Sequence, residues 1–245
     1  MRTVKLVIAF QGTRYDGWQS QRTGKTLQEV FEKHLARILT EKTNLTSSSR
    51  TDSGVHARGL VAHFKTKSVL PDAKLQAALN YYLPEDVLVL SAKTVADTFH
   101  ARYHAKSKTY EYLIWNSRTR PVYDLAPFCL WYPGPLNLSK MRRAARLLVG
   151  KHDFSAFRDS GDDEKDAVRT LYSILIRKTG PKVSIRVRGN GFLRHMVRIL
   201  VGTLLQASRG KLTIEDIKRA KNAKNRKKTG PTSKALGLTL LKVQY

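Results

Sequence analysis

The spacing of apolar residues alternates along this chain between the two-residue period of a strand and the 3.6-residue period of a helix. In the first part, the spacing predicts strands and helices in the order β-α-β-β-α-β. The expected elements are a strand at 4–10, a helix at 26–40, strands at 45–49 and 60–65, a helix between Pro71 and Pro84, and a strand at 87–95. This order restricts the fold more than any other feature of the sequence.

The second part of the chain repeats the same order. The expected elements are a strand at 108–115, a helix from Ser139 to Gly150, strands at 170–178 and 182–189, a helix at 192–208, a shorter helix capped by Thr213, and a strand at 238–243. Two such units are typical of ferredoxin-like, or RRM-like, halves. We therefore predict an α+β fold with two ferredoxin-like halves, at residues 1–104 and 105–245.

Positive charge is the second constraint. Lys and Arg number 45 against 19 Asp and Glu, which leaves a net charge of +26. Solubility needs far less, so the excess favours a polyanionic partner such as nucleic acid, an anionic membrane or an acidic protein. Taken together, the clusters of basic residues favour contact with phosphate. They comprise Arg142, Arg143 and Arg146, and a second group of Lys218, Arg219, Lys221, Lys224, Arg226, Lys227 and Lys228.

Several kinds of protein are disfavoured. Cys129 is the only cysteine, so no internal disulfide and no cysteine-rich metal site can form, and a reducing cytoplasm fits. No apolar stretch approaches the length of a membrane span, and the first residues lack the features of a signal peptide. The sequence also has no motif for a nucleotide cofactor or for a zinc hydrolase. We expect no metal and no small-molecule cofactor.

The segment Ser49–Gly59 connects two predicted strands and is the densest in candidate catalytic side chains. Asp52 has Arg50, His56 and Arg58 as neighbours in sequence, and we expect these cations to keep its carboxylate ionised. An ionised carboxylate serves as a nucleophile and is a poor general acid. The alternative is a purely structural turn, with Gly54 at a positive φ. Local composition leaves both interpretations open.

Segments spread over nearly the whole chain then point to one family. Arg50–Ala57 resembles the signature of the tRNA pseudouridine synthase A (TruA) family. Further blocks resemble that family in the same order along the chain: Tyr15–Gln19, Phe99–Arg102, Lys108–Tyr112, Gly150–Phe157, His195–Arg198 with Gly202, and Ala235–Leu238. Two departures are Ser49, where the family usually has Gly, and Lys108, where an Arg often precedes the Tyr-x-Tyr.

The resemblance implies a role for individual residues. Asp52 matches the catalytic aspartate, and Arg198 matches the arginine that pairs with it. Tyr110 matches the tyrosine that packs on the target base. Leu238 matches the apolar residue that closes the pocket, and Arg50 matches an arginine thought to help displace the base. Whether Asp52 attacks the base, attacks the sugar or chiefly removes a proton stays open.

The resemblance also implies the substrate and the assembly. The expected enzyme is an isomerase that forms pseudouridine at positions 38, 39 and 40 in the anticodon stem-loop of tRNA, after flipping the nucleotide out of its stack. His56 and Arg58 complete the expected substrate-binding set. The two halves would join into one continuous, mostly antiparallel sheet, with helices on one face and the active cleft on the other. A cytoplasmic homodimer is implied as well.

Alternatives to this interpretation remain for the protein and for single residues. A non-catalytic RNA-binding protein or RNA chaperone would share RRM-like halves, and Arg188–Phe192 weakly resembles an RRM core motif. A structural RNA-binding protein, such as a ribosomal one, would explain the charge. Tyr110 alternates with Tyr112 on one strand, so one of them is expected to lie in the core. Trp18 is a candidate core anchor, and His195 a hydrogen-bonded structural histidine.

Overall fold

The computed structural model describes residues 1–22, 24–159, 161 and 165–245. In these ranges the chain forms five α-helices and ten strands, in agreement with the predicted α+β class. The chain divides into two compact units: unit 1 comprises Met1–Lys106 with Thr239–Tyr245, and unit 2 comprises Ser107–Leu238. We had assigned 105–245 to the second half, but residues 239–245 belong to unit 1 because their strand pairs with a strand of that unit.

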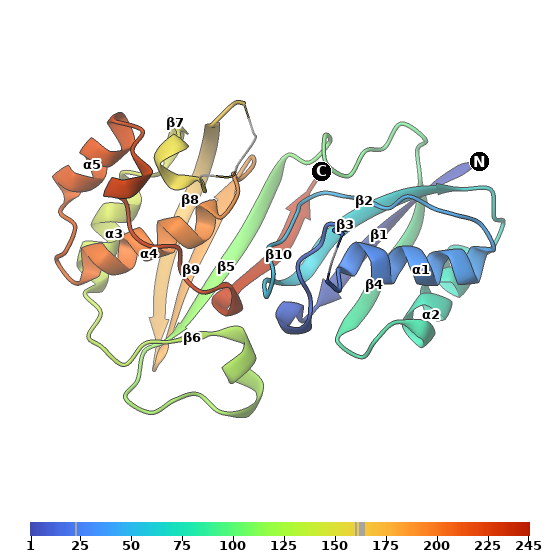
Figure 1. Cartoon of the computed structure of the whole chain (residues 1–245), viewed down its shortest axis with the longest axis horizontal. Coiled ribbons are helices and arrows are strands. Elements are labelled where there is room, and N and C mark those ends of the chain that lie inside the picture. The colour runs from blue at the N-terminus through green and yellow to red at the C-terminus, as the bar shows by residue number, and fades with distance from the viewer. Residues whose placement is uncertain (23, 160, 162–164) are drawn as a thin grey trace. The chain divides into compact units, whose positions relative to one another are not determined.

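Unit 1 is built on an antiparallel sheet with strand order β4-β1-β3 (Figure 1). The short β2 pairs antiparallel with β3, and β10 pairs parallel with β3. The elements are β1 (Arg2–Phe10), α1 (Leu27–Leu39), β2 (Thr46–Ser47), β3 (His56–Thr66), α2 (Asp72–Tyr82), β4 (Val87–Val95) and β10 (Leu238–Gln244). The first six follow the predicted β-α-β-β-α-β order, and their pairing is that of a ferredoxin-like sheet.

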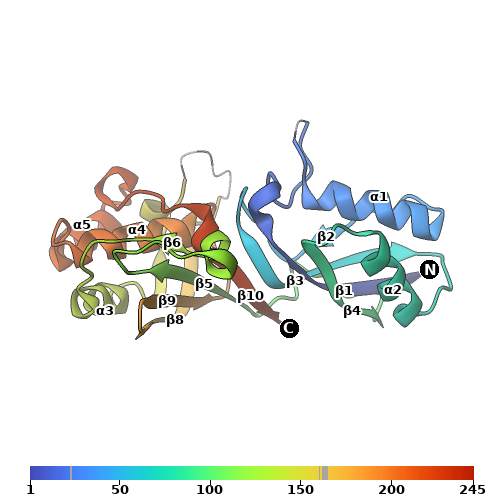
Figure 2. The same ribbon diagram turned by 90° about the horizontal axis from the view of Figure 1, so that it is seen from below.

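Both helices of unit 1 cover the same face of its sheet (Figure 2). Along β1, the side chains of Val4, Leu6 and Ile8 are fully buried and alternate with less buried neighbours, as a one-faced strand requires. In α1, the apolar side chains Phe31 and Leu35 are also fully buried. The core of unit 1 therefore lies between its helices and its sheet. The alternate residues of β1 point to the face of the sheet that the helices do not cover.

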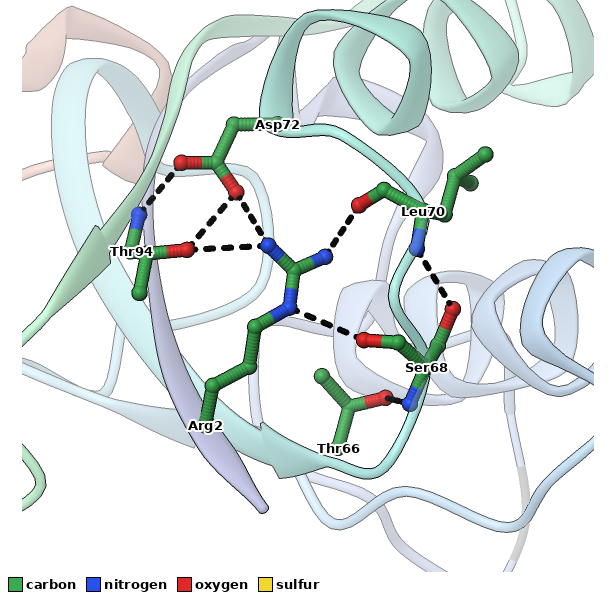
Figure 3. A network of polar contacts seen from close by, with 6 residues as sticks. All are labelled: Arg2, Thr66, Ser68, Leu70, Asp72 and Thr94. Atoms are coloured by element: carbon green, nitrogen blue, oxygen red, sulfur yellow. Dashed lines mark hydrogen bonds and ion pairs between the residues drawn. The ribbon is translucent and has the colours of Figure 1, made fainter.

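A polar network closes one end of unit 1 (Figure 3). The Arg2 guanidinium donates to the Asp72 carboxylate at 2.7 Å and to the Thr94 hydroxyl at 2.9 Å, and to the carbonyls of Ser68 and Leu70. The backbone N–H of Thr94 donates to Asp72 at 2.6 Å. The network connects the start of β1, the end of β4 and Asp72, the first residue of α2. A carboxylate at this position also interacts favourably with the dipole of α2.

Unit 2 contains a second antiparallel sheet, with strand order β5-β9-β8-β7, and β6 pairs parallel with β5. The strands are β5 (Ser107–Trp115), β6 (Leu130–Trp131), β7 (Gly150–Asp153), β8 (Val168–Thr179) and β9 (Lys182–Gly189). The helices are α3 (Leu138–Arg146), α4 (Met196–Ser208) and α5 (Ile214–Asn222). Short 3₁₀ helices occupy Gly12–Arg14, Tyr123–Phe128, Ser155–Phe157, Arg226–Lys228 and Ala235–Gly237.

Two predicted helices of unit 2 have different bounds in the structure. The helix expected at 139–150 is α3, which is capped by the Asn137 side chain and ends at Arg146. The helix expected at 192–208 is α4, which begins only at Met196. His195 has φ of +58°, a left-handed conformation that cannot continue a right-handed helix. In the described ranges, no helix has both the length and the apolar character needed to cross a membrane.

Candidate active site

The segment Ser49–Val55, which we call the aspartate loop, connects β2 to β3 in unit 1. Backbone hydrogen bonds hold it against the segment that follows β1. The Trp18 N–H donates to the Thr51 carbonyl at 3.1 Å, and the Gly54 N–H donates to the Tyr15 carbonyl at 3.3 Å. Because Tyr15 and Trp18 are each 2% exposed, the loop rests on a fixed part of the core. The Tyr15–Gln19 block thus supports the candidate catalytic loop.

Gly17 permits this close approach. Its φ is +91°, and a Cβ atom there would lie 2.5 Å from the Thr51 carbonyl oxygen. Any other residue would push the aspartate loop away from its support. The sequence places Gly17 and Trp18 in a block that resembles the family, but it does not predict this contact with Thr51. The available signal was a glycine close to two aromatic residues in the sequence, Tyr15 and Trp18.

Within the aspartate loop, Asp52 is half-buried and Arg50 is exposed. Gly54 has φ of +77°, and the Asp52 carbonyl accepts the Val55 N–H at 3.1 Å, so the structural turn that we considered is present. A turn and a catalytic role are compatible, because this hydrogen bond of the turn is made by the backbone carbonyl of Asp52. A half-buried carboxylate on a rigid loop is suited to act as a nucleophile or a base.

His56 and Arg58, the other two candidates from this segment, lie on β3. His56 is only 1% exposed, and its Nδ1 accepts the backbone N–H of Gly12 at 3.1 Å. His56 therefore holds the end of the aspartate loop through Gly12, and its contact with substrate stays a prediction. Arg58 is exposed, as a phosphate contact requires.

Unit 2 holds the remaining candidates, Tyr110, Arg198 and Leu238. We use the name arginine cluster for these three together with Tyr112 and Ser233, the two residues that lie close to Arg198. Arg198 lies in the first turn of α4. Its Nε donates to the Ser233 carbonyl at 2.8 Å, and the Ser233 N–H donates to the Arg198 carbonyl at 3.1 Å. These reciprocal bonds hold both the backbone and the guanidinium of Arg198. Ser233 was not among the predicted residues, and nothing in its local sequence identifies it.

The two tyrosines of the arginine cluster share one face of β5 but differ in their surroundings. Tyr112 is fully buried, and its hydroxyl donates to the Lys234 carbonyl at 2.8 Å. Burial raises the pKa of Tyr112 and the nearby charge of Arg198 opposes this shift. Tyr110 is 7% exposed and meets Phe192 edge to face, with ring centroids 5.1 Å apart. Both tyrosines are thus buried, and Tyr112 is the one that is buried completely. Leu238 is 5% exposed at the start of β10.

The start of α4 is braced by an ion pair. His195 Nδ1 lies 3.1 Å from an Asp159 carboxylate oxygen, and Arg194 Nε lies 3.7 Å from the same oxygen. The prediction that His195 is a hydrogen-bonded structural residue is therefore confirmed. His195 lies about one turn before Arg198. The same contact therefore helps to fix the start of α4, the helix that carries Arg198.

Many basic residues around α5 have partners within unit 2. Lys224 Nζ lies 2.7 Å from Asp153, and Arg219 lies 2.6 Å from Asp216. Lys221 donates to the Leu147 carbonyl at 3.2 Å. These cations contribute to the fold, so the part of this cluster that is available to phosphate is smaller than the sequence suggests.

Comparison with known proteins identifies the family. A family model described as tRNA pseudouridine synthase matches residues 6–104 and 144–245. The tRNA pseudouridine synthase A of Thermoanaerobacter sp. (strain X514) is 43% identical over 245 residues and is covered, like this chain, over 100% of its length. That of Syntrophotalea carbinolica is 45% identical over 246 residues, covering 100% of this chain and 97% of its own.

Two solved structures, a Cbf5-Nop10-Gar1 complex and an archaeal box H/ACA sRNP Nop10-Cbf5 complex, show a distant similarity. A chain of a Cbf5-Nop10-Gar1 complex matches with a TM-score of 0.42 and 12% identity, over 82% of this chain and 44% of that chain. This level is too low to support an argument, and the assignment rests on the sequence matches. Since a family model and full-length relatives agree, the chain belongs to the tRNA pseudouridine synthase A family.

Proposed function

We propose that this chain isomerises uridine to pseudouridine at positions 38, 39 and 40 in the anticodon stem-loop of tRNA. The observation that carries the proposal is 43% identity to a tRNA pseudouridine synthase A over the full length of both chains. The net charge of +26 supports a polyanionic substrate. The three positions come from the resemblance to the family.

The reaction is a redox-neutral rearrangement. The bond between uracil N1 and ribose C1′ breaks, the ring turns, and C5 bonds to C1′. A proton leaves C5 and N1 gains one, so the product is an isomer of the substrate. Asp52 is the proposed catalytic group, by attack on the base, attack on the sugar or removal of a proton. Each of these roles requires an ionised carboxylate, and the reaction needs no metal or small-molecule cofactor.

Arg198 is the proposed partner of Asp52. A carboxylate buried without a cation would take up a proton, so a pocket for this chemistry needs a fixed positive charge. The reciprocal bonds with Ser233 support this role, because they hold Arg198 in one place. The pairing also requires the proposed arrangement of the two ferredoxin-like halves, joined edge to edge in one continuous sheet with the cleft on the face opposite the helices.

The target nucleotide must leave its stack, at a cost of a few kcal/mol. Tyr110 is proposed to stack on the flipped base, which is worth roughly 1–3 kcal/mol. Its edge-to-face contact with Phe192 supports this role by fixing the ring. Arg50 is proposed to fill the vacated space, Leu238 to close the pocket and Arg58 to contact phosphate. We further propose a cytoplasmic homodimer.

An unmodified tRNA transcript tests the function. Incubation with the full chain should produce pseudouridine in the anticodon stem-loop, mapped by carbodiimide modification. Asp52→Asn should abolish the product and retain tRNA affinity. Asp124→Asn, at an exposed aspartate of unit 2, is the matched control and should keep full activity. Turnover by Asp52→Asn would remove Asp52 from its role, and tRNA binding without any product would favour the RNA chaperone alternative.

A further inference from the structure

A stacked aromatic pair lies on the face of the unit 1 sheet that its helices leave open. The pairing of β1 with β3 places Lys5 opposite His63, on the face away from the buried Leu6. The His63 ring lies 4.9 Å from the His100 ring, centroid to centroid, and His100 in turn stacks on Tyr103 at 4.2 Å and 29°. Tyr103 is 75% exposed, which is unusual for a ring held in a stack.

Hydrogen bonds fix the segment that carries this pair. His63 Nδ1 accepts the Ala101 N–H at 3.2 Å, and the Tyr245 hydroxyl donates to the Ala101 carbonyl at 2.7 Å. His100 Nδ1 accepts the N–H groups of Arg102 and Tyr103, each at 3.2 Å. Burial and neighbouring positive charge lower the pKa of His63 and of His100, which suits their roles as neutral acceptors. These hydrogen bonds restrict the backbone that carries the exposed Tyr103 ring, so less conformational freedom is lost when a ligand binds to it.

A cavity with two lysines in its lining shares one residue, His63, with the surroundings of this pair. It has a volume of about 350 Å³, and His63 lines it together with Lys42, Thr43, Asn44 and Lys65. Thr43 is only 4% exposed, and its hydroxyl has no hydrogen-bond partner in the described part of the chain. A buried hydroxyl without a partner is costly, so this one is suited to bind a ligand oxygen.

The charges around the cavity favour an anionic ligand. Lys42 and Lys65 supply two ammonium groups. The nearest acid in sequence, Glu41, is held by the Thr66 hydroxyl and by the Lys67 N–H. These two bonds and the charge of Lys67 neutralise much of the repulsion that Glu41 would exert on an anion.

We propose that this face of unit 1 binds an unpaired RNA nucleotide, with its base on the Tyr103–His100 pair and its phosphate at the cavity lined by Thr43 and Lys65. His63 connects the two parts, since it lines the cavity and contacts His100. Aromatic stacking beside a cationic groove is the general way in which proteins hold single-stranded nucleic acid. The proposal rests on the proposed function only for the expectation that RNA is the ligand, and it adds a contact apart from Asp52.

The stacking pair is tested with a fluorescein-labelled oligouridylate of about eight nucleotides. Its binding to the full chain is measured by fluorescence anisotropy. Tyr103→Ala should weaken the affinity about 5- to 150-fold, the range for loss of one base–aromatic stack, and Tyr103→Phe should retain it. Tyr81→Ala is the matched control, because Tyr81 is 81% exposed on α2 of the same unit. Equal affinities for the Tyr103→Ala and Tyr81→Ala variants would overturn the proposal and leave a protein partner as the better explanation of the exposed ring.

The cavity has its own test. Thr43→Val removes a hydroxyl that has no partner and keeps the shape, so the free chain should be as stable as the parent or more so, while the oligouridylate binds less tightly. Lys65→Ala should reduce the slope of log affinity against log salt by about 0.7, and Lys74→Ala, at an exposed lysine of α2, should reduce it less. If both Thr43→Val and Lys65→Ala bind the oligouridylate as tightly as the parent, the cavity is excluded as the phosphate-binding site.

The two proposals fail separately. If the parent chain forms no pseudouridine but Tyr103→Ala still weakens oligouridylate binding, the proposed function fails and the second RNA contact stands. If the parent modifies tRNA and oligouridylate binding does not depend on Tyr103, the second contact fails alone. Photocrosslinking of a 5-iodouridine oligonucleotide to the parent, with the adduct located by mass spectrometry, should give attachment at Tyr103; attachment only at Tyr110 would also overturn the proposal.

Discussion

Replacing Gly202 with alanine is the sharpest test of how Arg198 is held. An alanine in a helix is normally about 1 kcal/mol better than a glycine. Here, however, the new Cβ atom would lie 1.8 Å from the Pro231 carbonyl oxygen. The two backbones must separate by roughly 2 Å to reach an ordinary van der Waals distance. Such a shift breaks hydrogen bonds of normal length.

Three of the hydrogen bonds in the described part of the chain connect α4 to the segment around Pro231. Two join Arg198 and Ser233, and the third runs from the Gly230 N–H to the Thr203 hydroxyl at 2.9 Å. At about 1 kcal/mol each, their loss outweighs the gain in helix propensity by about 2 kcal/mol. The thermal unfolding midpoint of Gly202→Ala should therefore fall by about 4–8 °C.

Scanning calorimetry and urea unfolding of Gly202→Ala measure this loss. Gly134→Ala is the control, because its nearest neighbour is the flexible ring of Tyr132 at 3.3 Å, and we expect little change there. The single-turnover rate of pseudouridine formation should fall as well, since the displaced segment anchors Arg198. A Gly202→Ala chain as stable as the parent would refute the argument from close contact. A destabilised chain with a normal rate would show that this anchor does not matter for catalysis.

Three further predictions concern single side chains. Hydrogen bonding and charge from Lys224 lower the pKa of Asp153 to about 2, so Asp153→Asn should cost about 1 kcal/mol at pH 7 in urea unfolding. Because the folded pKa is depressed, this stabilisation is complete above about pH 4, and the gap between variant and parent should narrow from there toward pH 2. Asp72→Ala removes the ion pair to Arg2 and should destabilise the chain by about 2 kcal/mol in the same assay; an unchanged midpoint would make the network of Figure 3 energetically neutral. Tyr110→Ala should slow single-turnover catalysis more than it weakens tRNA binding, and Tyr110→Phe should be close to the parent; equal rates in all three would contradict stacking.

Elements with strong local signals were predicted from the sequence with nearly correct bounds. The strand at 87–95 has the predicted limits, and α5 begins at the capping box of Thr213 and Asp216. The helix expected at 26–40 is α1, which is capped by Thr26 through the Glu29 N–H and ends one residue earlier than expected, at Leu39. These features depend on a few neighbouring residues, so composition and spacing were sufficient. The ordered motifs also identified the family, which full-length relatives confirm.

The sequence could not predict where distant segments touch. The start of α4 depends on the contact of His195 with Asp159, and the end of unit 1 depends on the pairing of β10 with β3. Likewise, the burial of His56 follows from its bond to Gly12, 44 residues earlier in the chain. None of these contacts leaves a local pattern, because each partner is far away in the sequence.

The candidate site divides in the same way. From the sequence came the identities of Asp52, Tyr110 and Arg198, since each lies in a short motif of the family. Only the tertiary structure supplied what holds them, namely the support of the aspartate loop by Gly17 and the bonds of Arg198 to Ser233. The physical reason is that reactivity is a property of residue type, which the sequence lists, whereas positioning is a property of packing between segments that meet only after the chain has folded.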